Sequence, residues 1–165
     1  PEIHPTAFIH PDTTIIGNVK IGAESSVWPH TTLRGDDGRI VIGEQTSIQD
    51  GSVVHLTTDL SNTFIGSRVT VGHNVIAHGC TIGDDCIIGM GAILLDNCKI
   101  GRHVIVGAGT VVPMRKEIPD GVVIVGNPYK IVRKVEAEDL RMIEFSWKSY
   151  AAKARNYPAD TAPIS

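Results

Sequence analysis

Residues 81–112 read TIGDDC IIGMGA ILLDNC KIGRHV IVGAGT VV, and an aliphatic residue holds the second place of every six. Glycine often follows that residue, which relieves the crowding of a close corner. An α-helix would need apolar residues spaced by three and four, and this stretch lacks that spacing. A period of six is instead typical of a parallel β-helix, in which short strands and tight corners alternate, three to a coil.

The same period extends along most of the chain. The expected inward positions are Ile3, Ile9, Ile15, Ile21, Val27 and Leu33, then Ile42, Ile48 and Val54, then Ile65, Val71 and Ala77, and finally Ile82, Ile88, Leu94, Ile100, Val106, Val112 and Ile118. At three positions to a coil, these nineteen residues predict about six coils. We therefore expect an all-β solenoid domain over residues 1–135, with an exit strand at 126–133.

The period changes after Glu136. Apolar residues follow helical spacing as far as Tyr157, with acidic residues early and Lys153 and Arg155 late, as the helix dipole prefers. We expect a helix over 136–157 that packs along the solenoid and is ended by Pro158, and a frayed tail over 158–165. The stripe expected to face the solenoid consists of Leu140, Ile143, Trp147, Tyr150, Ala151 and Ala154.

Composition narrows the range of partners. The net charge of −3 does not indicate the basic surface that binds a nucleic acid. No apolar run reaches the roughly 18 residues that a membrane span needs. Cys80, Cys86 and Cys98 are an odd number of cysteines at no zinc-knuckle spacing. We expect free, mostly buried thiols in a reducing cytoplasm, and neither a nucleic acid nor a membrane as partner.

Three steps in the series break the period. The step after Leu33 is nine residues long, the step after Val54 is eleven, and the step after Ala77 is five. If each irregularity lies in a corner, counting three steps per coil puts these three residues on one face in successive coils. All three irregular steps then fall at the same corner of a three-sided prism.

Side chains alternate along a strand, so the residue after each inward aliphatic residue points outward. Arg34, His55 and His78 follow the three positions above and should form one outward column, spaced by about 4.8 Å. Two histidines so placed can share a metal ion, with each Nε2 about 2.0–2.1 Å from it. The same count aligns Asp50 with His73, one coil apart, on a different face.

A closed cyclic trimer of such prisms would press one column against the neighbour's other column. We therefore predict a metal site at a homotrimer interface, formed by His55 and His78 of one chain and His73 of the next. Asp50 would then form an ion pair with Arg34 of the adjacent chain.

The alternative is that these residues are solvated on a polar face. For a lone histidine solvation is the better interpretation, and Arg34, Asp36 and Asp50 could equally be ordinary surface charges. The matching columns favour a site for the three histidines. We apply the solvated interpretation to the other four, His4, His10, His30 and His103.

These motifs resemble the γ-class carbonic anhydrase family and its close bacterial relatives over nearly the whole chain. The matching segments are RGD at 34–36, QDG at 49–51, His55, and HNVIAH at 73–78. The resemblance implies a left-handed coil and a metal bound across a trimer interface. The roles it implies are metal ligation for His55, His73 and His78, interface contacts for Arg34, Asp36 and Asp50, and a hydrogen bond from Gln49 to solvent at the metal.

Some positions depart from the family pattern. Asp37 stands where some members carry a proton-shuttling glutamate, and Ser47 stands where they carry an active-site asparagine. The segment 56–62 is short, with Asp59 its only acid. Either Asp37 or Asp59 could relay a proton. The family also places a tyrosine of the C-terminal helix near the site, so Tyr150 is expected there.

The resulting prediction is reversible hydration of CO2 to bicarbonate, the lyase reaction of a carbonic anhydrase. Three neutral imidazoles leave Zn²⁺ its charge and an open position, and Fe²⁺ or Co²⁺ would also suit them. One alternative is a carbonic-anhydrase-like metal-binding or assembly protein with weak or no CO2 hydration. A hexapeptide acyltransferase with one histidine as general base is a second alternative, but it leaves the three matched histidines unexplained.

Overall fold

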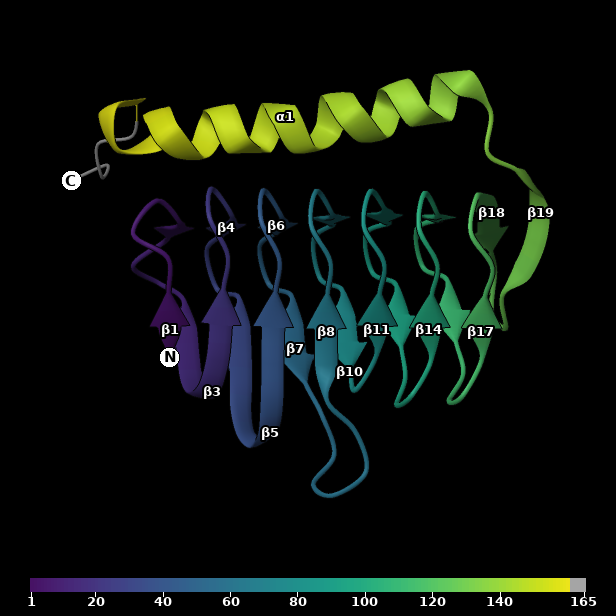
Figure 1. The fold of residues 1–165 in the computed structure, drawn as a ribbon, viewed down its shortest axis with the longest axis horizontal. Helices are drawn as coiled ribbons and strands as arrows, with labels where there is room; N and C mark the ends of the chain where they lie inside the picture. Colours follow the sequence, from purple (N-terminus) through teal and green to yellow (C-terminus); the bar gives the residue numbers. More distant parts are fainter. Residues whose placement is uncertain (161–165) are drawn as a thin grey trace.

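The computed structural model describes residues 1–160, with side chains described for residues 1–157. It is a left-handed parallel β-helix of about seven turns, with helix α1 (Ala137–Asp160) lying along one side (Figure 1). The expected fold class is confirmed. The turns number about seven rather than six because β18 (Val122–Val125) continues the coil past Ile118 and buries Ile124 completely.

The coil has three faces, each a parallel ladder of short strands. Face 1 contains β1 (Glu2–Ile3), β8 (Thr63–Ile65), β11 (Thr81–Ile82), β14 (Lys99–Ile100) and β17 (Glu117–Ile118). Face 2 contains β2 (Phe8–Ile9), β4 (Ser26–Val27), β6 (Ser47–Ile48), β9 (Thr70–Val71), β12 (Ile87–Ile88), β15 (Ile105–Val106) and β18. Face 3 contains β7 (Val53–His55), β10 (Ile76–His78), β13 (Ile93–Leu94) and β16 (Val111–Val112).

Two long strands join face 3 to face 1. The first halves of β3 (Thr14–Ile21) and β5 (Thr32–Ile42) pair on face 3, and their second halves pair on face 1. After β18, strand β19 (Lys130–Lys134) turns back and pairs with it antiparallel. We call the segments 35–39, 56–62 and 79–80 the irregular corner, because they connect face 3 to face 1 by loops of unequal length.

The predicted inward positions form the core. Leu33, Val54 and Ala77 are fully buried and stack on one another, since Leu33 pairs with Val54 and Val54 with Ala77. Each coil therefore contributes about one aliphatic side chain per face to a narrow interior, and burial of this apolar surface is the main stabilising term. The stacking confirms that the three irregular steps meet at one corner.

Helix α1 packs on face 2. Its inward residues are Ile143, Ala151 and Ala154, and the Ser146 hydroxyl lies 2.9 Å from the Thr70 hydroxyl. Leu140 was expected in the buried stripe but is 43% exposed, and it lines a surface hollow together with Arg68 and His103. The helix also runs to residue 160, past the expected stop at 158. A proline in the last turn removes only one helical hydrogen bond, so the helix can continue past it.

The remaining structural expectations concern the tail and the thiols. The predicted tail at 158–165 is helical as far as 160, and residues 161–165 lie outside the described part of the chain. All three cysteines are free and buried, as predicted. Burial raises the pKa of Cys86 to about 12, which makes its thiol unreactive at neutral pH. No helix within residues 1–160 is long and apolar enough to cross a membrane.

Candidate metal centre

Arg34, His55 and His78 form the outward column that the corner count predicted. The Cα atoms of His55 and His78 are direct partners across β7 and β10. Their ring centroids lie 5.3 Å apart, with the planes at 83°. Both side chains are partly exposed at the irregular corner. The loops at β5 and between β7 and β8 project from the coil there (Figure 1).

The hydrogen bonds of His55 fix its tautomer. Its Nδ1–H donates to the carbonyl oxygen of Arg34 at 2.6 Å, since that oxygen can only accept. Its Nε2 accepts from the Nη2–H of Arg34, also at 2.6 Å, because a guanidinium can only donate. His55 is therefore a neutral imidazole whose Nε2 lone pair points outward, and its side chain is only 12% exposed.

The ring of His78 is oriented by an acid that the sequence analysis did not predict. Its Nδ1–H donates to the carboxylate of Asp96 at 3.1 Å, which leaves Nε2 free. Burial by itself would raise the pKa of Asp96, but hydrogen bonds from Ser61 and His78 hold it below its usual value. The register offered a signal, because Ala77 pairs with Leu94 and Asp96 therefore follows the same corner one coil later.

His73 lies on face 2, as predicted. Val71 pairs with Ile48 across β9 and β6, which brings Nδ1 of His73 to 3.0 Å from the Asp50 carboxylate. Both side chains are nearly half exposed. Within one chain, His73 thus belongs to a different face from the column of His55 and His78, and the structure does not bring the three together.

The other site candidates on this side surround Asp50. Gln49 directly precedes it and is almost fully buried. Tyr150 packs beside Trp28 at 6.0 Å between ring centroids, and its pKa is raised by burial and by the nearby charge of Asp50. Ser47, in place of the family's asparagine, accepts a hydrogen bond from the Trp28 indole at 3.0 Å. Tyr150 therefore lies on the His73 side of the candidate site.

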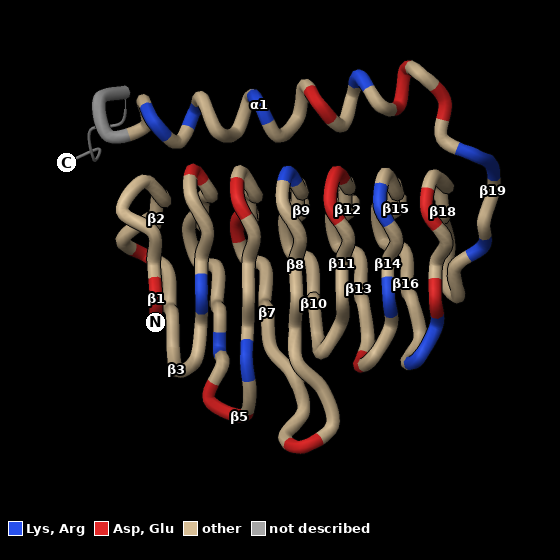
Figure 2. The backbone as a smooth tube through the Cα atoms, viewed as in Figure 1, with Lys and Arg blue, Asp and Glu red and all other residues tan. Residues whose placement is uncertain are grey.

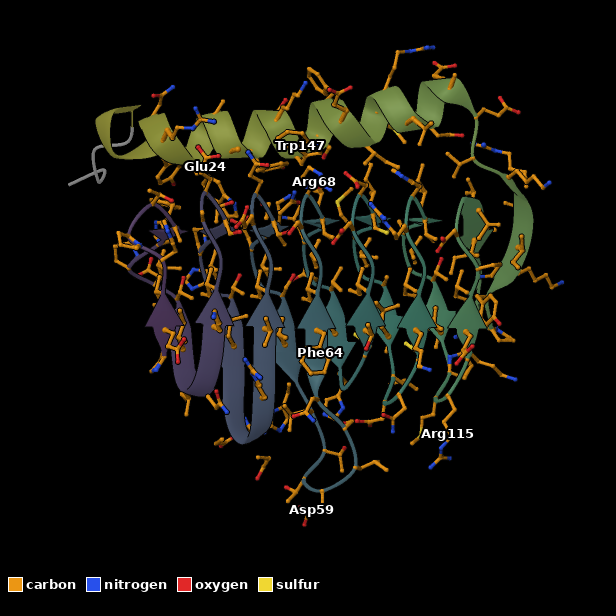
Figure 3. The ribbon with its side chains drawn as sticks, in the orientation of Figure 1. Glu24, Asp59, Phe64, Arg68, Arg115 and Trp147 are labelled. Atoms are coloured by element: carbon orange, nitrogen blue, oxygen red, sulfur yellow. The ribbon has the colours of Figure 1, made fainter. Side chains whose placement is uncertain are left out.

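The acids of the RGDD segment lie around His55. Arg34 Nη1 donates to both carboxylate oxygens of Asp36, at 2.9 and 3.0 Å, and this hydrogen bonding lowers the pKa of Asp36. Asp37 lies 3.6 Å from Nε2 of His55, within reach of the same position. Asp59 instead occupies the tip of the loop between β7 and β8 and projects away from the coil (Figure 3). Figure 2 shows acidic residues at the tips of both loops.

The four remaining histidines lie outside this constellation. His4, His30 and His103 are exposed, and the last two occupy corner positions with φ of 58° and 53°. His10 is only partly exposed, which corrects the expectation of a solvated side chain. Its ring lies against Phe8 and Tyr157, at centroid distances of 6.4 and 5.9 Å, because aromatic residues gather where α1 crosses the first coils.

The donor set fits a divalent metal of borderline softness. The Nδ1 atoms of all three histidines face an oxygen acceptor, namely a carbonyl for His55 and carboxylates for His73 and His78. Engagement of Nδ1 leaves Nε2 as the ligating atom, which is the usual support of a metal-bound imidazole. Among the described residues, the cluster of ligand-type atoms within 4.8 Å of one another consists of Asp36, Asp37 and His55.

Comparison with known proteins places the chain in a family. Residues 1–35 and 79–113 match the family described as bacterial transferase hexapeptide (six repeats). The chain is 40% identical to "Gamma carbonic anhydrase 2, mitochondrial" of Arabidopsis thaliana over 98% of its own length. The chain belongs to the γ-class carbonic anhydrase family of hexapeptide-repeat proteins. It spans about 60% of the length of that plant relative.

Two further relatives lie within the same fold and carry other descriptions. "Carnitine operon protein CaiE" of Escherichia coli O157:H7 is 38% identical over 91% of this chain and 76% of its own length. A solved structure of a hexapeptide transferase family protein from Anaplasma phagocytophilum is 38% identical, with a TM-score of 0.91. The match covers 95% of this chain and 92% of that one. The relatives of this chain therefore carry different descriptions.

Proposed function

We propose that this chain is a γ-class carbonic anhydrase that hydrates CO2 reversibly to bicarbonate at metal sites between the subunits of a homotrimer. The observation that carries the proposal is the shared orientation of His55, His73 and His78. The Nδ1 atom of each histidine faces an oxygen acceptor. His55 and His78 lie on face 3, and His73 lies on face 2. The three imidazoles do not meet within one chain, whereas contact between face 3 of one chain and face 2 of another would bring them together.

The apolar surface beside the histidine column supports assembly through face 3. Val53 and Ile76 point outward from β7 and β10 and are 40% and 38% exposed. They continue into Ile93 and Val111 along the same ladder. An apolar row of this kind next to Arg34, His55 and His78 gains stability when a second subunit covers it.

A divalent ion at the site, Zn²⁺ in this proposal with Fe²⁺ or Co²⁺ as alternatives, supplies a Lewis acid that lowers the pKa of water. Asp37, 3.6 Å from His55 and exposed, takes up the proton released by hydration and passes it to solvent. Gln49 orients the reactants by hydrogen bonding from the His73 side. Tyr150 lines that side from α1.

The interface charges complete the proposal. Within one chain Arg34 binds Asp36 and reaches His55, while Asp50 contacts His73. In the trimer, Arg34 turns from Nε2 of His55 toward Asp50 of the adjacent chain, which frees that nitrogen for the metal. Arg34, Asp36 and Asp50 thus hold the two halves of each site together. The free buried thiols support a reducing compartment, and we propose the cytoplasm.

The relatives motivate two alternatives. A metal-binding or assembly role with little CO2 hydration would use the same trimer and the same histidines. An acyltransferase role, suggested by the transferase names in the family, would require an acyl-CoA site between subunits. The histidine geometry favours the metal site over the acyl-CoA site.

The test is CO2 hydration by stopped flow on protein stripped of metal and reloaded separately with Zn²⁺, with Co²⁺ and, without oxygen, with Fe²⁺. We expect one metal per chain and hydration above the metal-free baseline, both lost in His73→Ala. His103→Asn, a histidine change at a corner outside the site, is the matched control and should retain both. Stoichiometric metal without hydration would support the assembly role. A wild-type protein that shows no metal binding and no hydration would reject the proposal.

A further inference from the structure

Asp96 is a buried carboxylate that contacts three side chains from two parts of the chain. It lies between β13 and β14 and is 8% exposed. Its Oδ1 accepts from the Ser61 hydroxyl at 2.5 Å, and its Oδ2 accepts from the Thr57 hydroxyl at 3.2 Å. Oδ2 also accepts from Nδ1–H of His78 at 3.1 Å. The carboxylate thus joins the irregular corner to a proposed ligand.

We propose that Asp96 is a positioning residue that fixes the tautomer and orientation of His78 for metal binding, while its second oxygen holds the loop 56–62 against the coil. This inference rests on the proposed metal site and deepens it. A carboxylate that accepts from Nδ1 keeps the proton on that nitrogen and presents the Nε2 lone pair outward. His55 needs no such acid, because the carbonyl of Arg34 performs the same task.

The surroundings of Asp96 leave room for this contact. Gly79, the residue after His78, has φ of +61°, and a Cβ built there would lie 2.2 Å from both Oδ1 of Asp96 and Oγ of Ser61. Only glycine at this position admits the carboxylate and the hydroxyl together. Asn97, next to Asp96, also donates its side-chain amide to the carbonyl of Leu60 at 3.2 Å. The residues around Asp96 therefore accommodate both its contact with His78 and its contact with the loop 56–62.

The competing explanation is that Asp96 only anchors the loop. Two variants separate the two roles. Asp96→Asn keeps an oxygen that accepts from Ser61 but loses the carboxylate opposite Nδ1 of His78. The double variant Thr57→Val with Ser61→Ala removes the loop hydrogen bonds and leaves the Asp96 to His78 contact. Glu117→Gln, which removes one exposed acid on β17 that pairs with Lys99, is the charge-matched control.

The readouts are the affinity for Co²⁺ by chelator competition, the visible absorption bands of bound Co²⁺, and thermal unfolding of the metal-free protein. We expect Asp96→Asn to weaken Co²⁺ binding about 10- to 100-fold and to alter the Co²⁺ bands. The loop double variant should lower the unfolding temperature but bind Co²⁺ with nearly wild-type affinity. Glu117→Gln should match wild type in all three.

The outcomes distinguish this inference from the proposed function. If the wild type binds no Co²⁺, the metal site itself is wrong. If the wild type binds Co²⁺ and Asp96→Asn binds it equally well, only the role of Asp96 is wrong. Equal loss in the loop variant and Asp96→Asn would mean that the carboxylate acts through the loop, which also overturns it.

A measurement on the unsubstituted protein covers the case in which Asp96→Asn does not fold. The ¹⁵N shifts of His78 in the metal-free wild type report which ring nitrogen carries the proton. We expect the proton on Nδ1. A proton on Nε2 instead would contradict the positioning role.

Discussion

The corner between faces 1 and 2 and the irregular corner are built on the same coil but differ in their regularity. The first repeats one turn in coil after coil, with a residue in the left-handed region at φ between 53° and 57° each time. From the second such residue on, the backbone amide also donates to a carbonyl of the preceding coil. The residues at this turn are Glu24, Gln45, Arg68, Asp85 and His103.

At the corner between faces 1 and 2, which we call the regular corner, charged side chains bind one another within the chain. Arg68 binds the Asp85 carboxylate through Nε and Nη2, at 2.7 and 2.9 Å, and lies beneath Trp147 of α1 (Figure 3). At the irregular corner, three loops of different length surround His55 and His78. Nε2 of His55 accepts a hydrogen bond from Arg34, whereas no described residue binds Nε2 of His78. The difference shows that the repeat fixes the backbone at one corner, whereas the length and side chains of the loops vary at the other.

The largest expected effect tests whether the irregular corner needs a second chain. A subunit with both His55→Ala and His78→Ala, or one with His73→Ala, cannot supply three imidazoles in a trimer of its own kind. We expect neither to hold metal tightly, since one or two imidazoles bind far more weakly. Co-expression of the two, with tags that contain no histidine, should restore tightly bound metal in mixed trimers. Mixed trimers that stay metal-free while wild type loads fully would show that the cross-subunit assignment is wrong.

The next effect concerns the charge at this corner. Arg34→Ala should weaken the trimer and metal retention together, because loss of one partner of a desolvated pair costs about 3–5 kcal/mol. Sedimentation velocity and metal content measure the two effects. Arg115→Gln is the control, because Arg115 stands at the same corner in a regular coil and projects outward (Figure 3). An Arg34→Ala trimer with full metal content would contradict the column arrangement.

Two glycines with similar backbone angles sharpen the comparison. Gly109 has φ of +68° with nothing within 4 Å of an added Cβ, so Gly109→Ala should cost only the left-handed strain of about 1 kcal/mol. Gly79→Ala adds a clash with Asp96 and Ser61 and should cost about 3 kcal/mol. Urea unfolding of metal-free protein measures both. Gly109 lies at the corner between faces 2 and 3, so equal costs would mean that the irregular corner is no more tightly packed than that one.

The smallest effect lies far from the irregular corner, at the start of α1. The side-chain hydrogen bond from Arg133, with a further one from the Glu136 amide, lowers the pKa of Asp139 from 3.8 to about 2. This acid therefore stabilises the fold fully above about pH 4, and its contribution is lost as the pH falls toward 2. Asp139→Asn should lose less helix stability than wild type between pH 4 and pH 2. Circular dichroism during unfolding in urea measures this difference. Glu138→Gln, in the same turn, should leave the pH dependence unchanged.

Much of the fold followed from counting residues, because the register of a coil is set by chain length between inward positions. The count placed Leu33, Val54 and Ala77 on one face and separated His73 from the pair His55 and His78, as the register has them. Contacts that depend on side-chain rotamers did not follow. The register puts Asp96 at the same corner as His78, one coil later, but its contacts with His78, Ser61 and Thr57 depend on side-chain rotamers that spacing does not fix.

The last coil and the exposure of Leu140 escaped prediction. β18 lies after Pro119, where the repeat is broken in sequence, yet Val123 and Ile124 pair with β15 as any further coil would. Hydrogen bonding to the previous coil can continue without the hexapeptide signature. Leu140 shows the converse case, since helical spacing put it in the buried stripe and yet it is 43% exposed.

Strand β19 affects whether further molecules can add to the end of the β-helix along its axis. Parallel coils present an open strand edge, and a second molecule that docked there would extend the ladder, so that chains could polymerise into a fibre. At this end of face 2, β19 reverses direction against β18 with a break in register and is exposed along its whole length. It carries Lys130 and Lys134, and a strand that docked on this edge would have to displace water from these charges. The reversed strand thus opposes filament formation on the face that carries the helix.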